Sequence, residues 1–337
     1  MNIFATLTAS DSTWNLPGLL STRPLAEGTN NSVHLLETAS GNYVVRLYRN
    51  HIDSARMSFE TSVLTSLEKM GLPFAVPVPI PTRSGELYTW VRAGGEEMPA
   101  TLTPFLSGAP AQPGHLGQAA AAGEALGVLD VALAQLPVPS EGISWRSYGD
   151  LEHCHPLVPD PRVGILQLPI SGEAMTRLLE RYDELVEEIP SLYASLPQQL
   201  SHEDYAPSNI LMEGERVTGV LDFEFCARDL GVMDVTVALS WWPVSEFGSG
   251  AEWPIIEAFC SGYARAKQLT EAEVDAIPTI YDLRAYTSLI HRLGRYRQGV
   301  SSLEAVIERA HAARERHRWL AKNSRRLVDT LARCQGL

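Results

Sequence analysis

Three polar residues in one short loop are the first indication of chemistry. His202, Asp204 and Asn209 stand in the spacing HxDxxxxN within LSHEDYAPSNIL. A loop that supports phosphoryl transfer needs a carboxylate to orient or deprotonate an acceptor hydroxyl. It also needs an amide oxygen, five residues on, to hold a magnesium ion. The spacing therefore predicts Asp204 as the catalytic base and Asn209 as a magnesium ligand.

A predicted β-hairpin connects this loop to a second carboxylate. ILM and RVTGVLDF alternate in the strand manner on either side of the turn EGE. Because a hairpin returns the chain to its starting point, Asp222 should lie beside Asn209, where both can share metal ions that bridge ATP phosphates. The HxD pattern alone often occurs by chance, and an Asp before a turn is more often a cap than a metal ligand. The ordered combination favours the functional interpretation.

The elements that must position these residues form two parts. Strand-like SVHLLETA and NYVVRLYR, a helix over 54–70, and two further strands in AVPVPIPTRSGELYTWV and ATLTPFLSGAP make the first part strand-rich. The composition then shifts to helix-forming GQAAAAGEALGVLDVALAQL. Further helices are expected at about 172–195 and from 229 to the end, with an irregular insertion at 137–171. We predict an α+β, bilobal protein divided into residues 1–107 and 108–337.

Composition narrows the class of partner. The chain has 337 residues, and 27 basic against 40 acidic side chains give a net charge of −13, which argues against nucleic acid and anionic membranes. The four cysteines lie far apart and indicate reduced thiols. No apolar run approaches the roughly 20 residues of a membrane span. We expect a cytoplasmic enzyme without nucleic-acid or membrane partners, and we allow for a homodimer.

A resemblance to a known family rests on these motifs. HEDYAPSNIL followed by GVLDFEFCARDLGVMDV resembles the signature of the aminoglycoside phosphotransferase and choline kinase superfamily, which includes kinase-like homoserine kinases. Its usual form is close to HGDxHxxNxL followed by xxIDFxxAxxxxxxxDL. GTNNSVHLL, YVVRLYR, FETSVLTSLEKMGLP and LTPFLSG resemble, in order, its phosphate loop, nucleotide-pairing strand, N-lobe helix and hinge. The resemblance implies a protein-kinase-like fold with an antiparallel N-lobe sheet plus one helix, and a larger, mostly helical C-lobe.

The resemblance also implies roles for individual residues. Asp204 would be the catalytic base or the hydroxyl-orienting group, and Asn209 and Asp222 the Mg²⁺ ligands. His202 would be a structural residue, and Asp234 an N-cap or a brace of the loop. The implied ATP-binding residues are Gly28, Asn31, Arg46, Glu60, Thr103 and Phe105. Arg46 departs from the family, which usually has lysine there; we expect it to contact phosphate and to pair with Glu60. A second departure, Asp130, concerns packing.

The acceptor stays open at this stage. Acceptors in the resembling group include aminoglycosides, choline, homoserine, methylthioribose and hydroxylysine, all small polar molecules with a hydroxyl. The excess of acidic residues leans towards an amine-bearing acceptor, and homoserine or a related amino alcohol is our expectation. The alternative is a non-catalytic, nucleotide-binding regulatory module of the same fold. A protein-serine kinase is disfavoured because no APE segment follows Asp222.

Two other groups of residues attract attention without supporting a site. His153, Cys154 and His155 have no third spaced ligand, so we do not predict a metal there. Trp241, Trp242 and Trp253 are expected in the core or a pocket wall rather than in a base-stacking platform, given the acidic charge.

Overall fold

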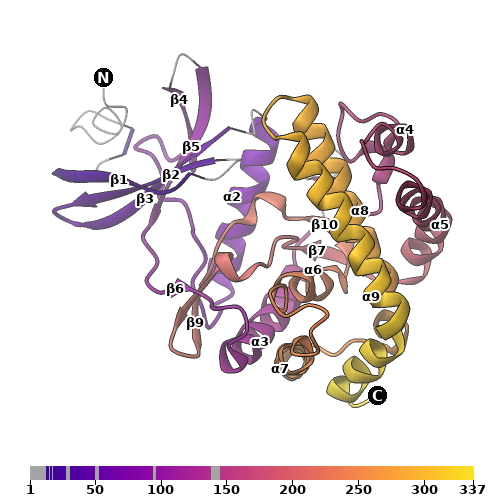
Figure 1. Ribbon diagram of the computed structural model, residues 1–337. Coiled ribbons are helices and arrows are strands. Elements are labelled where there is room, and N and C mark those ends of the chain that lie inside the picture. The colour runs from indigo at the N-terminus through magenta and orange to yellow at the C-terminus, as the bar shows by residue number, and fades with distance from the viewer. Residues whose placement is uncertain are drawn as a thin grey trace.

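We describe a computed structural model of the chain. The described residues are 13–14, 16, 18–27, 31–49, 53–93, 96–137 and 145–337. In the N-terminal part, five strands form an antiparallel sheet in the order β1-β2-β3-β5-β4 (Figure 1). The strands are β1 (Leu19–Glu27), β2 (Asn31–Thr38), β3 (Gly41–Tyr48), β4 (Thr89–Ala93) and β5 (Glu96–Pro104).

One helix accompanies this sheet, as predicted. Helix α2 (Ser54–Lys69) begins where the Asp53 side chain accepts a hydrogen bond from the Ala55 N–H. Its inner face buries Met57, Val63, Leu64 and Leu67. The periodic spacing of these apolar residues thus matches the helix face turned to the core.

The segment before β4 differs from the prediction. We expected a strand through 75–82, but the segment forms no strand. Its contacts include an isolated bridge at Ala75 and a hydrogen bond of 2.7 Å from Ile80 N to Leu102 O. Prolines at positions 77, 79 and 81 explain the difference, because proline cannot donate to a β-ladder.

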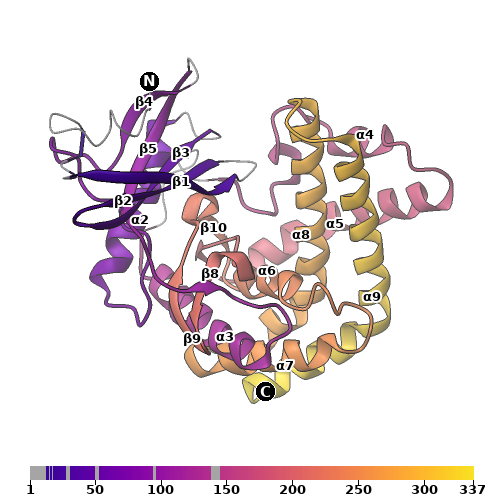
Figure 2. The same cartoon turned by 60° about the vertical axis from the view of Figure 1, so that its left-hand side comes forward.

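The remainder of the chain is mostly helical (Figure 2). The helices are α3 (Leu116–Leu133), α4 (Pro161–Leu166), α5 (Glu173–Ser195), α6 (Met233–Trp241), α7 (Glu252–Ala266), α8 (Glu271–Arg297) and α9 (Leu303–Gln335). Short strands lie among them: β6 (Ala109–Pro110), β7 (Gln198–Ser201), β8 (Ile210–Glu213), β9 (Arg216–Val220) and β10 (Ala227–Leu230). Strand β7 pairs with β10, and β6, β8 and β9 form a three-stranded sheet. The fold is bilobal and kinase-like, as predicted.

Helix α3 is apolar enough, by length and composition, to cross a membrane, yet 61% of it is buried inside the protein. The backbone of α3 packs closely against the backbone of α7. A Cβ atom at Gly123 would lie 2.0 Å from Phe259 O, and one at Gly262 would lie 1.9 Å from Ala120 O. Glycines at the contact permit this approach, so the apolar character of α3 is that of a core helix.

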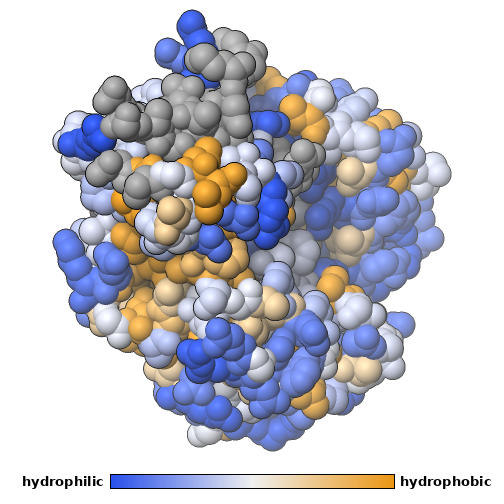
Figure 3. All heavy atoms as spheres, turned by 90° about the vertical axis from the view of Figure 1, so that its left-hand side faces the viewer, coloured by the Kyte–Doolittle hydropathy of each residue, from blue (hydrophilic) through white to orange (hydrophobic). Residues whose placement is uncertain are grey.

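The surface of the strand-rich side is uneven. Hydrophobic residues gather across the middle of this face, and hydrophilic residues cover the region below it (Figure 3). Large apolar side chains exposed in the N-terminal part include Leu20, Trp90 and Phe105. The apolar side chains are therefore not spread evenly over this face.

Candidate active site

The loop after β7 is held by hydrogen bonds to a buried carboxylate. Asp234, in the first turn of α6, accepts hydrogen bonds from the backbone N–H groups of His202 at 2.5 Å and Glu203 at 2.6 Å. The fully buried His202 ring lies 2.9 Å from Leu221 O through Nε2. Asp234 therefore braces the loop, and His202 ties it to the strand that leads to Asp222.

The hairpin brings the predicted polar residues together. Asn209 donates from Nδ2 to Asp204 Oδ2 at 3.0 Å and to Asp204 O at 2.9 Å. Leu221 N donates to Asn209 O at 2.8 Å, so Asp222 follows directly beside Asn209. Among described non-glycine residues, only Glu203 and Asp222 have positive φ, 67° and 66°. Such strained backbone persists where surrounding structure enforces it, often at functional sites.

A cavity of about 920 Å³ lies over this hairpin. Its walls come from β2, β3, α2, β5 and the 204–225 segment, so both lobes contribute. It is lined by most of the residues that we predicted for the site: Asn31, Arg46, Glu60, Thr103, Phe105, Asp204, Asn209 and Asp222. Gly28, also predicted, lies outside the described residues.

Arg46 joins the two lobes, but not through the predicted partner. Its Nη2 lies 2.6 Å from Asp222 Oδ1 and 3.0 Å from Glu224 Oε2. Asn31 Nδ2 donates to Glu224 Oε2 at 2.5 Å. Glu60, expected to pair with Arg46, instead accepts a hydrogen bond of 2.9 Å from the Tyr48 hydroxyl. The expected pairing is wrong because the longer, forked guanidinium reaches across the cavity to the opposite lobe.

The electrostatics of this cavity are dominated by burial and by close carboxylates. Burial, reinforced by Asp222, raises the pKa of Asp204 to about 7, although Arg284 and Asn209 act in the opposite direction. Burial alone would lower the pKa of Arg46, but the negative charges of Asp222 and Glu224 outweigh it. Asp204 can therefore exchange a proton near neutral pH.

The oxygen donors of Asn209 and Asp222 suit a hard divalent cation. Magnesium is usually held by one or two protein oxygens, with phosphate oxygens and water completing its shell. In the part of the chain that the structure describes, no group of three His, Cys, Asp or Glu side chains could hold a metal alone. The pair therefore fits an ion delivered with a polyphosphate better than a permanent structural metal.

A second cavity of about 710 Å³ lies on the other side of Asp204. It shares Asp204, Phe225 and Trp241 with the first cavity, and its other walls come from the 145–159 segment, α8 and α9. Trp241 is thus a pocket wall, as expected, while Trp242 and Trp253 are buried in the core. The carboxylate of Asp204 stands where the two spaces meet.

The HCH group lies beside this second cavity. His153 Nδ1 contacts Asp150 Oδ1 at 2.6 Å, and the His155 ring packs 5.9 Å from that of His291. The Cys154 thiol contacts Thr287 O at 3.5 Å. These contacts anchor the segment to α8 and do not converge on one point.

Sequence reasoning missed two site residues. Glu224 follows the Asp–Phe pair directly and could have been noticed as a neighbour of the metal carboxylate. Arg284, in the middle of α8, lies 80 positions beyond Asp204 in a helix whose sequence carries no motif. Only the packing of α8 brings it to the second cavity.

Comparison with known proteins agrees with this geometry. The model of the phosphotransferase enzyme family matches residues 21–269. A homoserine kinase of Bradyrhizobium sp. (strain ORS 278) is 28% identical over 285 residues, which cover 83% of this chain and 82% of that kinase.

Solved structures show the same fold. A microcompartment-associated aminopropanol kinase superposes with a TM-score of 0.73 at 19% identity, covering 96% of this chain and 97% of that one. An amicoumacin kinase in complex with AMP-PNP, Ca²⁺ and its ligand gives a TM-score of 0.66 at 17% identity, covering 90% of each chain. The family match spans well over half of the chain, so the protein belongs to the phosphotransferase enzyme family and is an ATP-dependent kinase of small molecules.

Proposed function

We propose that the protein transfers the γ-phosphate of ATP to the hydroxyl of a small polar metabolite of the homoserine type. One observation carries the proposal: Asp204 stands between two cavities, with Asn209 and Asp222 on the side of the larger one. Phosphoryl transfer needs the acceptor hydroxyl in line with the γ-phosphate and within reach of such a carboxylate, so a carboxylate that lines both a donor space and an acceptor space suits the reaction.

The larger cavity suits the nucleotide. Adenine would lie against the β5 end, at Thr103 and Phe105, with its phosphates towards Arg46 and Asn31. Arg46 Nε and Asn31 Oδ1 are buried atoms without a hydrogen-bond partner among the described residues. Such atoms favour a ligand that supplies the missing partners. In this proposal residues 1–107 form the nucleotide lobe and residues 108–337 carry the catalytic loop.

Asn209 and Asp222 would hold Mg²⁺, which neutralises charge on the phosphates when it is bound. Asp204 would orient the acceptor hydroxyl and take its proton, for which a pKa of about 7 is well matched. Asn209 fixes the Asp204 carboxylate by a hydrogen bond. The smaller cavity would hold the rest of the acceptor on the other side of this carboxylate.

The acceptor assignment rests on the homoserine kinases among the relatives. The experiment is ATP turnover with Mg²⁺ over a panel of homoserine, amino alcohols and aminoglycosides, with Asp204→Ala as the test variant. We expect turnover with at least one acceptor and its loss, by about 10²–10⁴-fold, in the variant, while AMP-PNP affinity stays within a few-fold. ATP binding without transfer to any acceptor would instead support the regulatory alternative.

A further inference from the structure

The smaller cavity has an unusual charge for a protein this acidic. Among the described residues, six arginines line it, against three carboxylates. The arginines are Arg56, Arg146, Arg284, Arg292, Arg295 and Arg309. Most come from α8 and α9, which pack together along their length (Figure 2). The local charge is therefore opposite to the net charge of −13.

Arg284 is the most informative of these residues. Its exposed fraction is 8%, and within the described ranges it has no hydrogen bond or ion pair; its Nε is buried without a partner. Its guanidinium lies 4.7 Å from the centre of the Trp241 ring, on which Arg309 also packs at 5.9 Å. Neither of these two arginines forms an ion pair with any described carboxylate.

Nearby carboxylates compensate part of this charge: Arg146 pairs with Asp150 at 2.7 Å, and the charge of Asp204 acts on Arg284. Burial, reinforced by Asp229 and Asp234, raises the pKa of Glu203 well above its usual value. Burial, together with the neighbouring guanidinium groups, lowers the pKa of both Arg284 and Arg309. A buried cation without an ion-pair partner is costly, so the buried guanidinium of Arg284, in the wall of a cavity lined by further arginines, indicates an anionic ligand.

We propose that the smaller cavity binds an anionic group of the acceptor, a carboxylate or a phosphate, with Arg284 as its main contact and Arg309 beside it. The inference deepens the proposed function, on which it rests, and assigns the acceptor to anionic alcohols. Guanidinium groups bind carboxylate and phosphate through paired N–H donors. Homoserine carries such an anionic group together with the amine that the net charge led us to expect.

Three related alcohols distinguish the contributions of the two charged groups of homoserine to binding. Homoserine has a carboxylate and an amine, 4-hydroxybutyrate has only the carboxylate, and 3-aminopropan-1-ol has only the amine. Binding is measured by calorimetry with the wild-type protein in the presence of AMP-PNP and Mg²⁺, so that no turnover is needed. We expect homoserine and 4-hydroxybutyrate to bind, and 3-aminopropan-1-ol to bind on the order of 10- to 100-fold more weakly. Glycerol 3-phosphate against glycerol tests the phosphate source in the same way.

Variants then locate the anion. Arg284→Met and Arg309→Met should each lower the affinity for the preferred anion on the order of tenfold or more. The affinity for 3-aminopropan-1-ol should stay unchanged. Arg284→Lys should retain part of the preference, because it keeps the charge but not the fork. Arg318→Met, an exposed position on the same helix as Arg309, is the matched control. A merely structural role would weaken all ligands alike.

Tighter binding of 3-aminopropan-1-ol than of both anions would overturn the proposal. So would anion binding that survives Arg284→Met and Arg309→Met, or the absence of any anion binding to a folded protein. Anion binding that depends on Arg284, in a protein without turnover on any acceptor, would refute the proposed function and leave the anion site standing.

Discussion

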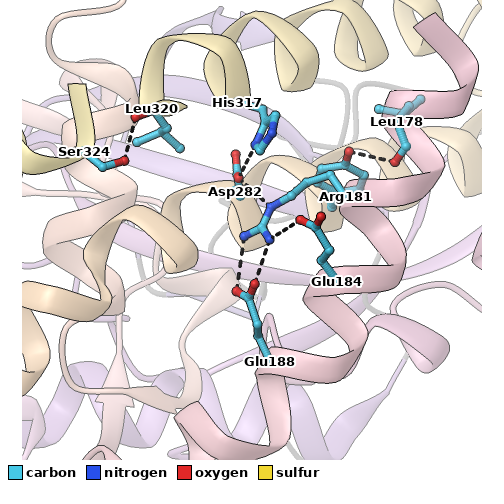
Figure 4. Close-up of polar contacts among 9 residues, drawn as sticks. Leu178, Arg181, Glu184, Glu188, Asp282, His317, Leu320 and Ser324 are labelled. Atoms are coloured by element: carbon cyan, nitrogen blue, oxygen red, sulfur yellow. Dashed lines mark hydrogen bonds and ion pairs between the residues drawn. The ribbon is translucent and has the colours of Figure 1, made fainter. Parts of the chain in front are cut away.

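Two buried arginines of the C-terminal lobe have opposite surroundings. Arg181 of α5 donates to Glu184, to Glu188 and to Asp282 of α8, and His317 of α9 contacts the same Asp282 at 2.8 Å (Figure 4). Arg284 lies only two residues beyond Asp282 on α8, yet no described carboxylate pairs with it.

This difference distinguishes Arg181, whose charge has a structural role, from Arg284, whose charge we propose binds a ligand. The cation of Arg181 is matched inside the fold, so its network joins three helices without any further partner. The cation of Arg284 faces a cavity and packs on the Trp241 ring, and it forms no ion pair with a described carboxylate, although the charge of Asp204 acts on it. Where a fold already contains carboxylates able to pair, an unpaired buried arginine indicates a role in binding.

The largest effect should come from breaking the matched network. Arg181→Met should lower the free energy of unfolding by about 3–5 kcal/mol, because it leaves the buried Asp282 with only His317. Acceptor preference should not change. Urea unfolding measures the loss, and Arg177→Met, an exposed pair partner of Glu173 on the same helix, is the control, with an expected loss below about 1 kcal/mol. Equal losses in both variants would contradict the comparison.

Arg46 represents an intermediate case, since its carboxylate partners line the larger cavity, which we propose for the nucleotide. Arg46→Met should reduce AMP-PNP affinity on the order of 10- to 100-fold and leave the affinity for the acceptor unchanged. Arg46→Lys should retain most of the nucleotide affinity, since lysine also binds phosphate as a point charge. Calorimetry with Mg²⁺ and AMP-PNP measures both. Unchanged nucleotide affinity in Arg46→Met would assign Arg46 to lobe pairing alone.

The stability of Arg284→Met tests the same comparison between Arg284 and Arg181. In the absence of ligand, the free energy of unfolding of the variant should equal or slightly exceed that of the wild type, with a difference within about 1 kcal/mol. The variant loses the contact with Trp241, but it no longer has to bury a charge, and the two effects offset each other. Added homoserine should raise the melting temperature of the wild type by more than that of the variant at the same concentration. A loss of several kcal/mol without ligand would show that Arg284 is structural, like Arg181.

The smallest effect concerns pH. The hydrogen bond to Asp282 raises the pKa of His317 above its ordinary value of 6.5. A raised pKa in the folded state means that the stabilisation is complete below about pH 6.5 and is lost as pH rises through the folded-state value. His317→Gln should therefore destabilise the protein at pH 6 by a few tenths of a kcal/mol, since the ring is partly exposed, and by less at pH 9. A difference that grows with pH would contradict this sign.

Local patterns were sufficient for much of the fold. The β2–β3 hairpin, helix α2, helix α3 and the β8–β9 hairpin all follow from apolar periodicity and turn residues, which act over a few positions. The hairpin argument also placed Asp222 beside Asn209. The strand expected through the three prolines was wrong, because residue preference for extended backbone does not supply missing N–H donors.

The sequence by itself determined the catalytic loop, the hairpin that returns Asp222 to it, and the family, because these depend on residues close together in the chain. Only the tertiary structure decided which carboxylates Arg46 meets and which arginines surround the smaller cavity. Those contacts join residues 43 to 178 positions apart, and net charge says nothing about where charges gather. Pairing of buried charges is set by how helices and lobes pack, and no local pattern records it.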